Sequence, residues 1–320
     1  MAVEAAVAAT PAEATDSDER GRKTVRREAW EIAERLDKMT MKGLREDTRD
    51  CPPPDREAVI EVISGLQSLL FPLCFQRENA RMTDAALLER TLVVLEDQAV
   101  AALLFDRENP GDAAEEAERL IGAFARRLPE VKRLLLLDIE ALYEGDPAAK
   151  RREEVVICYP GFFATTVYRL AHELYLLGLP LIPRVMTEFA HGKTGIDIHP
   201  GATIGEYFFI DHGTGIVIGE TTVIGDHVKL YQGVTLGAKS FETDENGNPV
   251  KGIKRHPNIG SHVVIYANAT ILGGRTTIGD HCVIGGNCWV THSVEPGRTV
   301  AYTPQENRGN ADHFLWGDGI

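Results

Sequence analysis

The sequence predicts an α + β protein, with an all-helical region over residues 23–191 followed by a parallel β-helix of six-residue repeats over residues 192–300. Two observations predict this division. Before Gly195, apolar residues recur at the three- and four-residue spacing of amphipathic helices. After Gly195 that spacing stops, and aliphatic residues recur every six positions. The chain has 320 residues, which is long enough for both parts.

The helical region is expected to follow a disordered lead-in over residues 1–22, which is rich in alanine and carries scattered acidic residues. One apolar stripe runs from Val25 to Leu36, and a second runs from Phe163 to Leu177. Proline-containing segments at 51–54, 109–111 and 144–147 should separate the helices. Gly178 and Pro180 should end the second striped helix. We interpret both stripes as helix-on-helix core.

The second half carries the six-residue repeat. Its inward aliphatic positions are Ile198, Ile204, Ile210, Ile216, Ile218, Ile224, Leu230, Leu236, Ile259, Ile265, Ile271, Leu272, Ile278, Ile284 and Val290. A small or β-branched residue usually stands four places on, and a glycine often follows the aliphatic. This pattern is typical of a solenoid with three short faces and about 18 residues per coil. Cys282 and Cys288 take the small inward position and are interpreted as packing residues.

A polar insertion interrupts the repeat between Leu236 and Ile259 and predicts a loop over residues 237–258. Loops of this length on a rigid scaffold often carry function. The insertion is rich in basic side chains: Lys239, Lys251, Lys254, Arg255 and His256. From composition alone it could be an anion-binding loop or a solvated charged loop.

Composition excludes some classes of partner. The formal net charge of -14 argues against nucleic acid and anionic membranes, which need a basic surface. No stretch has the roughly 20 apolar residues of a transmembrane helix. The five cysteines are scattered without a CxxC pair, which favours a reducing cytoplasm and gives no zinc motif.

Three histidines have neighbours that suggest chemistry: His199, His212 and His256. His212 lies close to one coil beyond Asp197, so adjacent coils could bring the two together, although spacing alone does not establish contact. A neutral imidazole beside a carboxylate can take the proton of an attacking hydroxyl. Four other histidines are interpreted as surface residues: His172, His227, His262 and His281.

Several runs together resemble the serine O-acetyltransferase family. They are residues 195–205 (GIDIHPGATIG), 210–216 (IDHGTGI), 219–221 (GET), 255–257 (RHP), 144–148 (EGDPA) and 159–162 (YPGF). The resemblance covers about residues 135–300, and the earlier helices resemble the longer N-terminal domain of one bacterial branch. It implies that the β-helix is left-handed. Generic hexapeptide acyltransferases share the repeat but lack the 210–216 and 255–257 runs.

The resemblance implies a reaction and roles for individual residues. Acetyl-CoA would acetylate the hydroxyl of L-serine by direct attack in a ternary complex, as the first step of cysteine biosynthesis. His212 would be the general base, and Asp197 would orient it. Asp146 and Asp211 would hold the serine amino group. Arg255 and His256 would hold its carboxylate.

The resemblance also implies binding partners. The acetyl-CoA residues would be Gly237, Ala267, Gly273, Gly274 and Arg275, although the 237–258 loop departs from the enteric enzymes. Acetyl-CoA would be a co-substrate, with no tightly bound cofactor and no metal. Three β-helices would associate into a homotrimer or a dimer of trimers, with each active site between neighbours.

Two further implications concern regulation and the end of the chain. L-cysteine would be a feedback inhibitor, since it differs from serine by one atom. The tail over residues 301–320 would bind O-acetylserine sulfhydrylase through Ile320, or would be a frayed terminus.

The sequence leaves three other interpretations of the function open. The first is a hexapeptide acetyltransferase for another hydroxyl acceptor, such as a sugar. The second is a zinc enzyme like γ-type carbonic anhydrase, which needs three converging histidines. The third is a scaffold that has lost catalysis and only binds the sulfhydrylase.

Overall fold

The computed structural model describes residues 27–36, 52–75, 82–106, 111–240 and 243–302. The chain divides into two compact units, residues 1–50 and 51–320. In the first unit, residues 27–36 form a helix, as the first apolar stripe predicts. Its apolar side chains, among them Ile32 and Leu36, are exposed, so interpreting this stripe as helix-on-helix core was wrong. The expected lead-in over residues 1–22 and the terminal Ile320 lie outside the described residues.

Six helices open the second unit: α2 (Arg56–Leu70), α3 (Asp84–Asp106), α4 (Ala113–Gly145), α5 (Arg152–Cys158), α6 (Pro160–Leu176) and α7 (Ile182–Thr194). The predicted breaks at 109–111, 144–147 and 178–180 separate α3 from α4, α4 from α5 and α6 from α7, whereas the breaks between α2 and α3 and between α5 and α6 were not predicted. Asp55 caps α2 by accepting the backbone N–H groups of Glu57 and Ala58. Helix α7 continues to Thr194, slightly beyond the expected boundary at 191, and ends at the left-handed Gly195 (φ 70°). No helix in the described part of the chain is long and apolar enough to span a membrane.

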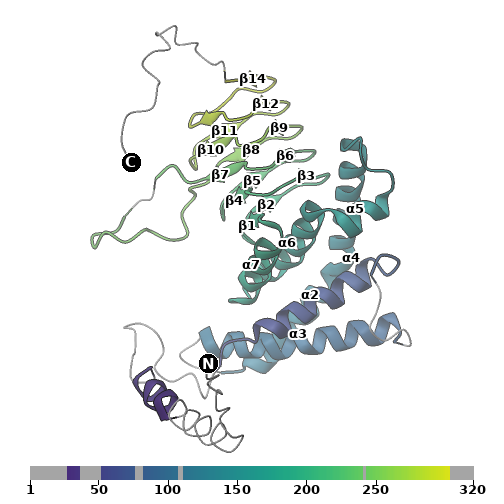
Figure 1. Ribbon diagram of the computed structural model, residues 1–320, viewed down its shortest axis with the longest axis vertical. Helices are drawn as coiled ribbons and strands as arrows, with labels where there is room; N and C mark the ends of the chain where they lie inside the picture. Colours follow the sequence, from purple (N-terminus) through teal and green to yellow (C-terminus); the bar gives the residue numbers. More distant parts are fainter. Residues whose placement is uncertain (1–26, 37–51, 76–81, 107–110, 241–242, 303–320) are drawn as a thin grey trace, which may run out of the picture. The chain divides into compact units, whose positions relative to one another are not determined.

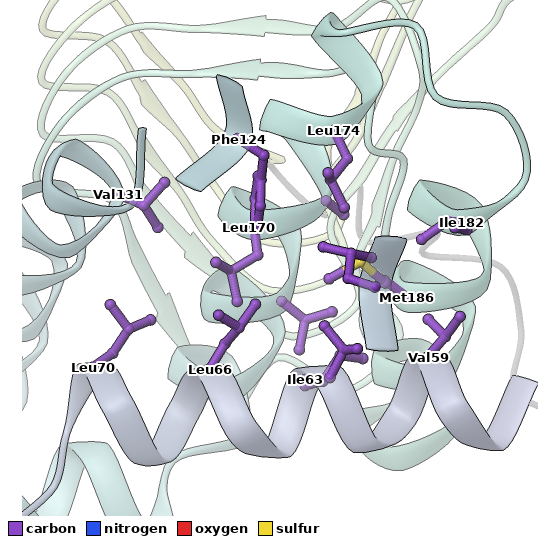
Figure 2. Close-up of a cluster of buried hydrophobic side chains, with 14 of the residues drawn as sticks. Val59, Ile63, Leu66, Leu70, Phe124, Val131, Leu170, Leu174, Ile182 and Met186 are labelled. Carbon is purple, nitrogen blue, oxygen red and sulfur yellow. The ribbon is translucent and has the colours of Figure 1, made fainter. Parts of the chain in front are cut away.

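The helical core is built from one face of each helix (Figure 2). Helix α2 contributes residues four or three apart, from Val59 to Leu70. It contacts α3 and α7 and shares one buried cluster with side chains of α4 and α6. Leu170 and Leu174, both fully buried, carry the predicted stripe of α6 into this core. The stripe is therefore core packing, as the sequence predicts.

The second part is a left-handed parallel β-helix of short strands stacked in three sheets (Figure 1). Sheet 1 contains β1 (Asp197–Ile198), β4 (Val217–Ile218), β7 (Thr235–Gly237), β10 (Thr270–Leu272) and β13 (Trp289–Val290). Sheet 2 contains β2 (Thr203–Ile204), β5 (Val223–Ile224), β8 (Asn258–Ile259) and β11 (Thr277–Ile278). Sheet 3 contains β3 (Phe209–Asp211), β6 (Lys229–Tyr231), β9 (Val264–Ile265), β12 (Val283–Ile284) and β14 (Thr299–Val300).

The strand register confirms the predicted coil. Val217 pairs with Thr235, one predicted coil length along the chain. The predicted inward aliphatics are buried with one exception, Leu272, which is only half-buried. Ile271 takes the inward place, pairing with Leu236 and Val290, so the one-residue slip falls after it, next to the left-handed Gly273. Cys282 and Cys288 are buried, as expected for packing residues.

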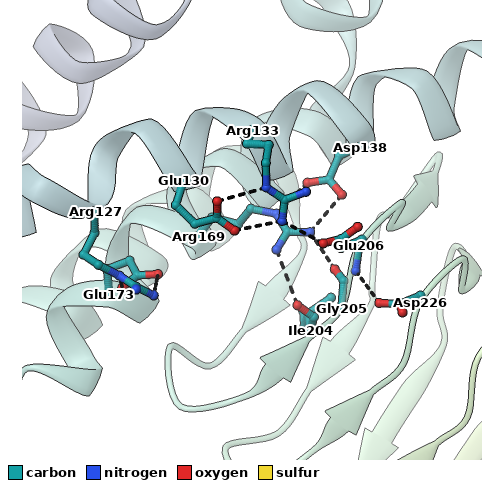
Figure 3. Close-up of polar contacts among 10 residues, drawn as sticks. All are labelled: Arg127, Glu130, Arg133, Asp138, Arg169, Glu173, Ile204, Gly205, Glu206 and Asp226. Atoms are coloured by element: carbon teal, nitrogen blue, oxygen red, sulfur yellow. Dashed lines mark hydrogen bonds and ion pairs between the residues drawn. The ribbon is translucent and has the colours of Figure 1, made fainter.

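Helices α4, α6 and α7 contact the first coil, and a buried ion pair fixes this junction (Figure 3). Arg169 of α6 donates to both carboxylate oxygens of Asp138 on α4, at 2.5 and 2.8 Å. Arg169 also donates to the carbonyl of Gly205, and Asp138 accepts the backbone N–H of Phe208. The pair therefore holds the segment that leads into β3.

Candidate active site

The predicted site residues gather in two clusters at two corners of the β-helix. We call Asp146, Tyr159, Asp211 and His212 the acidic cluster, which lies where the chain turns from sheet 3 to sheet 1. We call Glu220, Thr221, Lys254, Arg255 and His256 the basic cluster, which lies where the chain turns from sheet 1 to sheet 2. Strand β4 separates the two corners along the chain.

His212 stands in a tight turn at the end of β3. It has a left-handed backbone (φ 59°), as do Gly213 and Gly215, a conformation that this β-helix repeats at the corners of His227, His262 and His281. The Asp211 carboxylate accepts the His212 backbone N–H at 2.8 Å and lies 3.6 Å from His212 Nδ1. The His212 side chain is 68% exposed, so this turn presents the imidazole to solvent.

Asp146 reaches the same corner from the helical region. It caps the C-terminal end of α4, and its Oδ1 accepts the Ala148 backbone N–H at 2.8 Å. Two glycines let the helices approach β3 this closely. A Cβ on Gly145 would lie 2.5 Å from the Phe209 ring, and one on Gly161 would lie 2.4 Å from the Ile210 carbonyl oxygen.

The hydrogen bonds within the acidic cluster stabilise the ionised form of the Asp146 carboxylate. The Tyr159 hydroxyl donates to Asp146 Oδ2. That bond, the Ala148 N–H and the proximity of His212 lower the pKa of the Asp146 carboxyl. Burial and the Asp146 bond raise the pKa of the Tyr159 hydroxyl. Asp146 is therefore an anion held by a neutral phenol.

The basic cluster forms where the insertion returns to the coil. The Thr221 hydroxyl accepts the backbone N–H groups of Arg255 and His256 at 3.0 and 3.1 Å. Lys254 Nζ donates to the Thr221 carbonyl, and Arg255 pairs with Glu220. A Cβ on Gly219 would lie 2.1 Å from the His256 ring, so glycine is required under the imidazole.

His256 is a neutral imidazole with a defined tautomer. Its Nδ1 accepts the Thr221 backbone N–H at 3.0 Å and lies 2.9 Å from the Thr221 hydroxyl. Nδ1 therefore carries no proton, and the ring proton is on Nε2. Burial, followed by the proximity of Arg255, lowers the pKa of His256 to about 4. The ring can thus donate a hydrogen bond from Nε2 without carrying a charge.

Asp197 lies in β1, with its carboxylate near Glu188 and His191 of α7. One ligand atom from each of the three residues lies within 4.8 Å of the others. Arg184 pairs with Glu188, which offsets part of the negative charge that a cation would need. Within the described ranges, no hydrogen bond or ion pair joins Asp197 to His212. The orienting role of Asp197 stays a prediction.

The predicted acetyl-CoA residues only partly converge. The Gly273 backbone N–H donates to the Gly237 carbonyl at 3.0 Å. Beside them, a Cβ on Gly274 would lie 2.5 Å from the Lys254 carbonyl oxygen, so these three glycines adjoin the basic cluster. Arg275 follows as an exposed residue. Ala267 lies between β9 and β10, at the corner between sheets 3 and 1, where its carbonyl accepts the Asn287 N–H.

The other histidines bear on the alternative interpretation as a zinc enzyme. His227, His262 and His281 are exposed, as expected, and stack at the corner between sheets 2 and 3 with ring centroids 4.7 Å apart. His256 and His262 thus lie at different corners, which argues against a zinc site built from them. His172 is half-buried, and its Nδ1 lies 2.7 Å from the Pro200 carbonyl, so interpreting it as a surface histidine was wrong.

Sequence reasoning gave no role to three residues that shape the clusters. Tyr159, Glu220 and Thr221 occur in the runs quoted for the resemblance, but their contacts involve residues 13 to 35 positions away. Neither the six-residue period nor the helical stripe encodes such contacts. The signal available was their position in short polar runs next to predicted site residues.

No family model matches the chain. A plasmid serine acetyltransferase of Synechococcus elongatus is 48% identical over 281 residues, covering 84% of this chain and 86% of that protein. Serine acetyltransferase 1 of Entamoeba histolytica, solved with L-cysteine, superposes with a TM-score of 0.67 at 38% identity, covering 79% of this chain and 90% of that one. Serine acetyltransferase of Brucella abortus, solved with coenzyme A, gives a TM-score of 0.52 at 29% identity, covering 76% and 93%.

Proposed function

The chain belongs to the serine acetyltransferase family, and from this premise we propose that it makes O-acetyl-L-serine and CoA by a histidine-assisted direct transfer. The observation that carries the proposal is that the β-helix carries one acidic cluster with an exposed imidazole, that of His212, and a separate basic cluster. A free amino acid presents an ammonium and a carboxylate, so a site for it needs one clamp of each sign.

The acidic cluster is the proposed ammonium clamp. Asp146 and Asp211 supply two carboxylates beside His212, and the interactions that lower the pKa of Asp146 favour its ionised form. The basic cluster is the proposed carboxylate clamp. Arg255 supplies a guanidinium, and the neutral His256 supplies an Nε2–H donor. Glu220 holds Arg255 and balances its charge until the substrate carboxylate arrives.

The proposed chemistry is one addition and one elimination. His212 takes the proton of the serine hydroxyl as its oxygen attacks the thioester carbonyl carbon of acetyl-CoA. The tetrahedral intermediate collapses, the C–S bond breaks, and the CoA sulfur leaves with the proton returned by His212. Asp197 would stabilise the imidazolium after a rotation of the exposed His212 ring. The coil from Ala267 to Gly274 would receive the pantetheine arm.

The two clamps favour an active site shared between copies of the chain. The titratable groups of the acidic cluster influence one another, as do those of the basic cluster, and among the described residues no contact joins the two clusters. One small substrate must nevertheless reach both. We therefore propose a homotrimer, alone or paired with a second trimer, in which the acidic cluster of one copy faces the basic cluster of its neighbour.

Regulation by L-cysteine is part of the proposal. The Entamoeba histolytica relative was solved with L-cysteine. Cysteine keeps both charged groups of serine, so both clamps would accept it, and inhibition should be competitive with L-serine. Binding of the sulfhydrylase through Ile320 concerns residues outside the described ranges and stays a prediction.

The test compares acceptors side by side. CoA release is measured with L-serine, L-homoserine and a sugar acceptor, using the wild type and His212→Ala. We expect L-serine to be the preferred acceptor, and turnover to fall roughly a hundred- to ten-thousand-fold in the variant, as for loss of a general base. A sugar preferred over L-serine would refute the acceptor, and near-normal turnover in the folded variant would refute the role of His212.

A further inference from the structure

Tyr159 is an uncharged member of the acidic cluster that contacts the Asp146 carboxylate directly. Tyr159 is the residue that precedes α6, and its hydroxyl donates to Asp146 Oδ2. The other carboxylate oxygen, Oδ1, accepts the Ala148 backbone N–H at 2.8 Å. Each oxygen of Asp146 is thus held by one donor, which fixes the plane of the carboxylate.

The position of Tyr159 is itself fixed. Pro160 starts α6, and Gly161 lies so close to β3 that a Cβ there would approach the Ile210 carbonyl oxygen to 2.4 Å. The next residue of β3 is Asp211, the second carboxylate of the cluster. The start of α6 therefore packs against β3, which ends at Asp211 immediately before His212. Tyr159, held at this position, fixes the Asp146 carboxylate through its hydrogen bond.

The donor and the acceptor of the hydrogen bond between Tyr159 and Asp146 are defined. Asp146 is ionised, so it accepts, and the phenol donates. Each carboxylate oxygen keeps a second lone pair free after accepting one hydrogen bond. Those free lone pairs are what a substrate ammonium would use.

We propose that Tyr159 is a positioning residue that selects acceptors bearing an α-ammonium group, by holding the Asp146 carboxylate in a fixed orientation near His212. This inference rests on the proposed function. It predicts that loss of the hydroxyl weakens recognition of the ammonium and leaves recognition of the carboxylate and of acetyl-CoA unchanged.

The experiment uses Tyr159→Phe, which removes the hydroxyl and keeps the ring. Steady-state kinetics with L-serine should show KM raised on the order of tenfold, with kcat and the KM for acetyl-CoA close to wild type. Affinity is then measured for two competitors that each carry one end of serine. Ethanolamine has the ammonium, and 3-hydroxypropionate has the carboxylate. Tyr159→Phe should weaken ethanolamine by a similar factor and leave 3-hydroxypropionate unchanged.

Tyr143→Phe is the matched control. Tyr143 lies near the end of the same helix, α4, with the Arg152 guanidinium 4.2 Å from its ring centroid, a contact that Phe retains. This variant should behave as wild type in every measurement.

The possible outcomes separate this inference from the proposed function. Equal weakening of both competitors by Tyr159→Phe would show a general disturbance of the site and would overturn the positioning role, as would an unchanged serine KM. A wild-type protein that fails to acetylate L-serine would instead refute the proposed function. In that case the two competitors still test whether the hydroxyl supports an ammonium site.

Discussion

The Thr222 hydroxyl destabilises the core of the β-helix. Thr222 occupies the small inward position of its coil, is 1% exposed, and among the described residues its Oγ1 is a buried side-chain oxygen with no hydrogen-bond partner. An unpaired buried hydroxyl costs free energy because water has been removed from it without replacement. Valine fills the same inward position at Val228, Val234 and Val263.

Thr222→Val should therefore raise the free energy of unfolding, by about 1 kcal/mol, since the side-chain shape is kept and the unpaired oxygen is removed. Urea unfolding followed by circular dichroism measures the change. Thr276→Val is the control, because the buried Thr276 hydroxyl donates to the Leu272 carbonyl at 2.7 Å. That variant should be destabilised, and destabilisation of both would contradict the interpretation of Thr222.

His256 makes stability depend on pH in a predictable direction. Its pKa lies at about 4 in the folded chain against an ordinary 6.5, chiefly because of burial. Between these values the unfolded chain binds a proton that the folded chain does not. Acidification through this window therefore favours unfolding, and the loss is complete once the pH falls below about 4.

We expect this histidine to account for on the order of 2 kcal/mol of stability lost between pH 6.5 and pH 4. The comparison is His256→Asn, whose side-chain oxygen can still accept the Thr221 backbone N–H but does not titrate. Unfolding midpoints of both proteins across this range give the difference. Parallel pH profiles would show that His256 is not the responsible group.

At the scale of elements, the junction between the helices and the first coil depends on one buried ion pair. Asp138 and Arg169 have side chains 1% and 3% exposed. Removing one partner leaves the other as an uncompensated buried charge, which costs more than the pair itself contributes. Arg169 also donates to the carbonyl of Gly205 (Figure 3). Asp138 accepts the N–H of Phe208, so the pair lies directly before β3.

Asp138→Ala should lower the free energy of unfolding by about 3 kcal/mol. The double variant Asp138→Leu, Arg169→Met should lose less, because no buried charge remains. Glu130→Ala on the same helix is the control, since Glu130 pairs with Arg133 in solvent, and such pairs contribute about 0–1 kcal/mol. Equal effects of Asp138→Ala and Glu130→Ala would contradict the role given to burial.

The elements themselves could be predicted because each follows a local period. The stripe from Phe163 to Leu177 predicted α6, and the six-residue step predicted the strands and the departure of the insertion after Gly237. The Leu272 register was missed because the slip depends on a left-handed backbone at Gly273, which a side-chain pattern does not reveal. Contacts such as Thr221 with His256 were also missed, since they depend on how coils with an insertion between them stack.

In the assembled protein, the placement of the two clusters determines which copies of the chain complete a site. His212 and Arg255 lie at different corners, and the proposed trimer would join them across an interface. His212→Ala and Arg255→Ala should each be nearly inactive alone. A mixed trimer isolated through two different affinity tags has one interface at which an intact His212 faces an intact Arg255, whichever variant is in the majority. Its activity should be about a third of wild type.

The control pairs two defects within one cluster. His212→Ala mixed with Asp211→Ala leaves no chain with an intact acidic cluster, so mixed trimers should stay inactive because no interface is complete. Size-exclusion chromatography with light scattering confirms that both mixtures have assembled. If the His212→Ala and Arg255→Ala mixture is as inactive as its parents, both clusters serve one site within a single chain, and the shared site is refuted. If both mixtures regain activity, His212 and Asp211 can act from different chains, and the acidic cluster is not a single clamp. Only recovery confined to the pair from different clusters fits a site completed by a neighbour, because only that pair supplies one intact copy of each clamp.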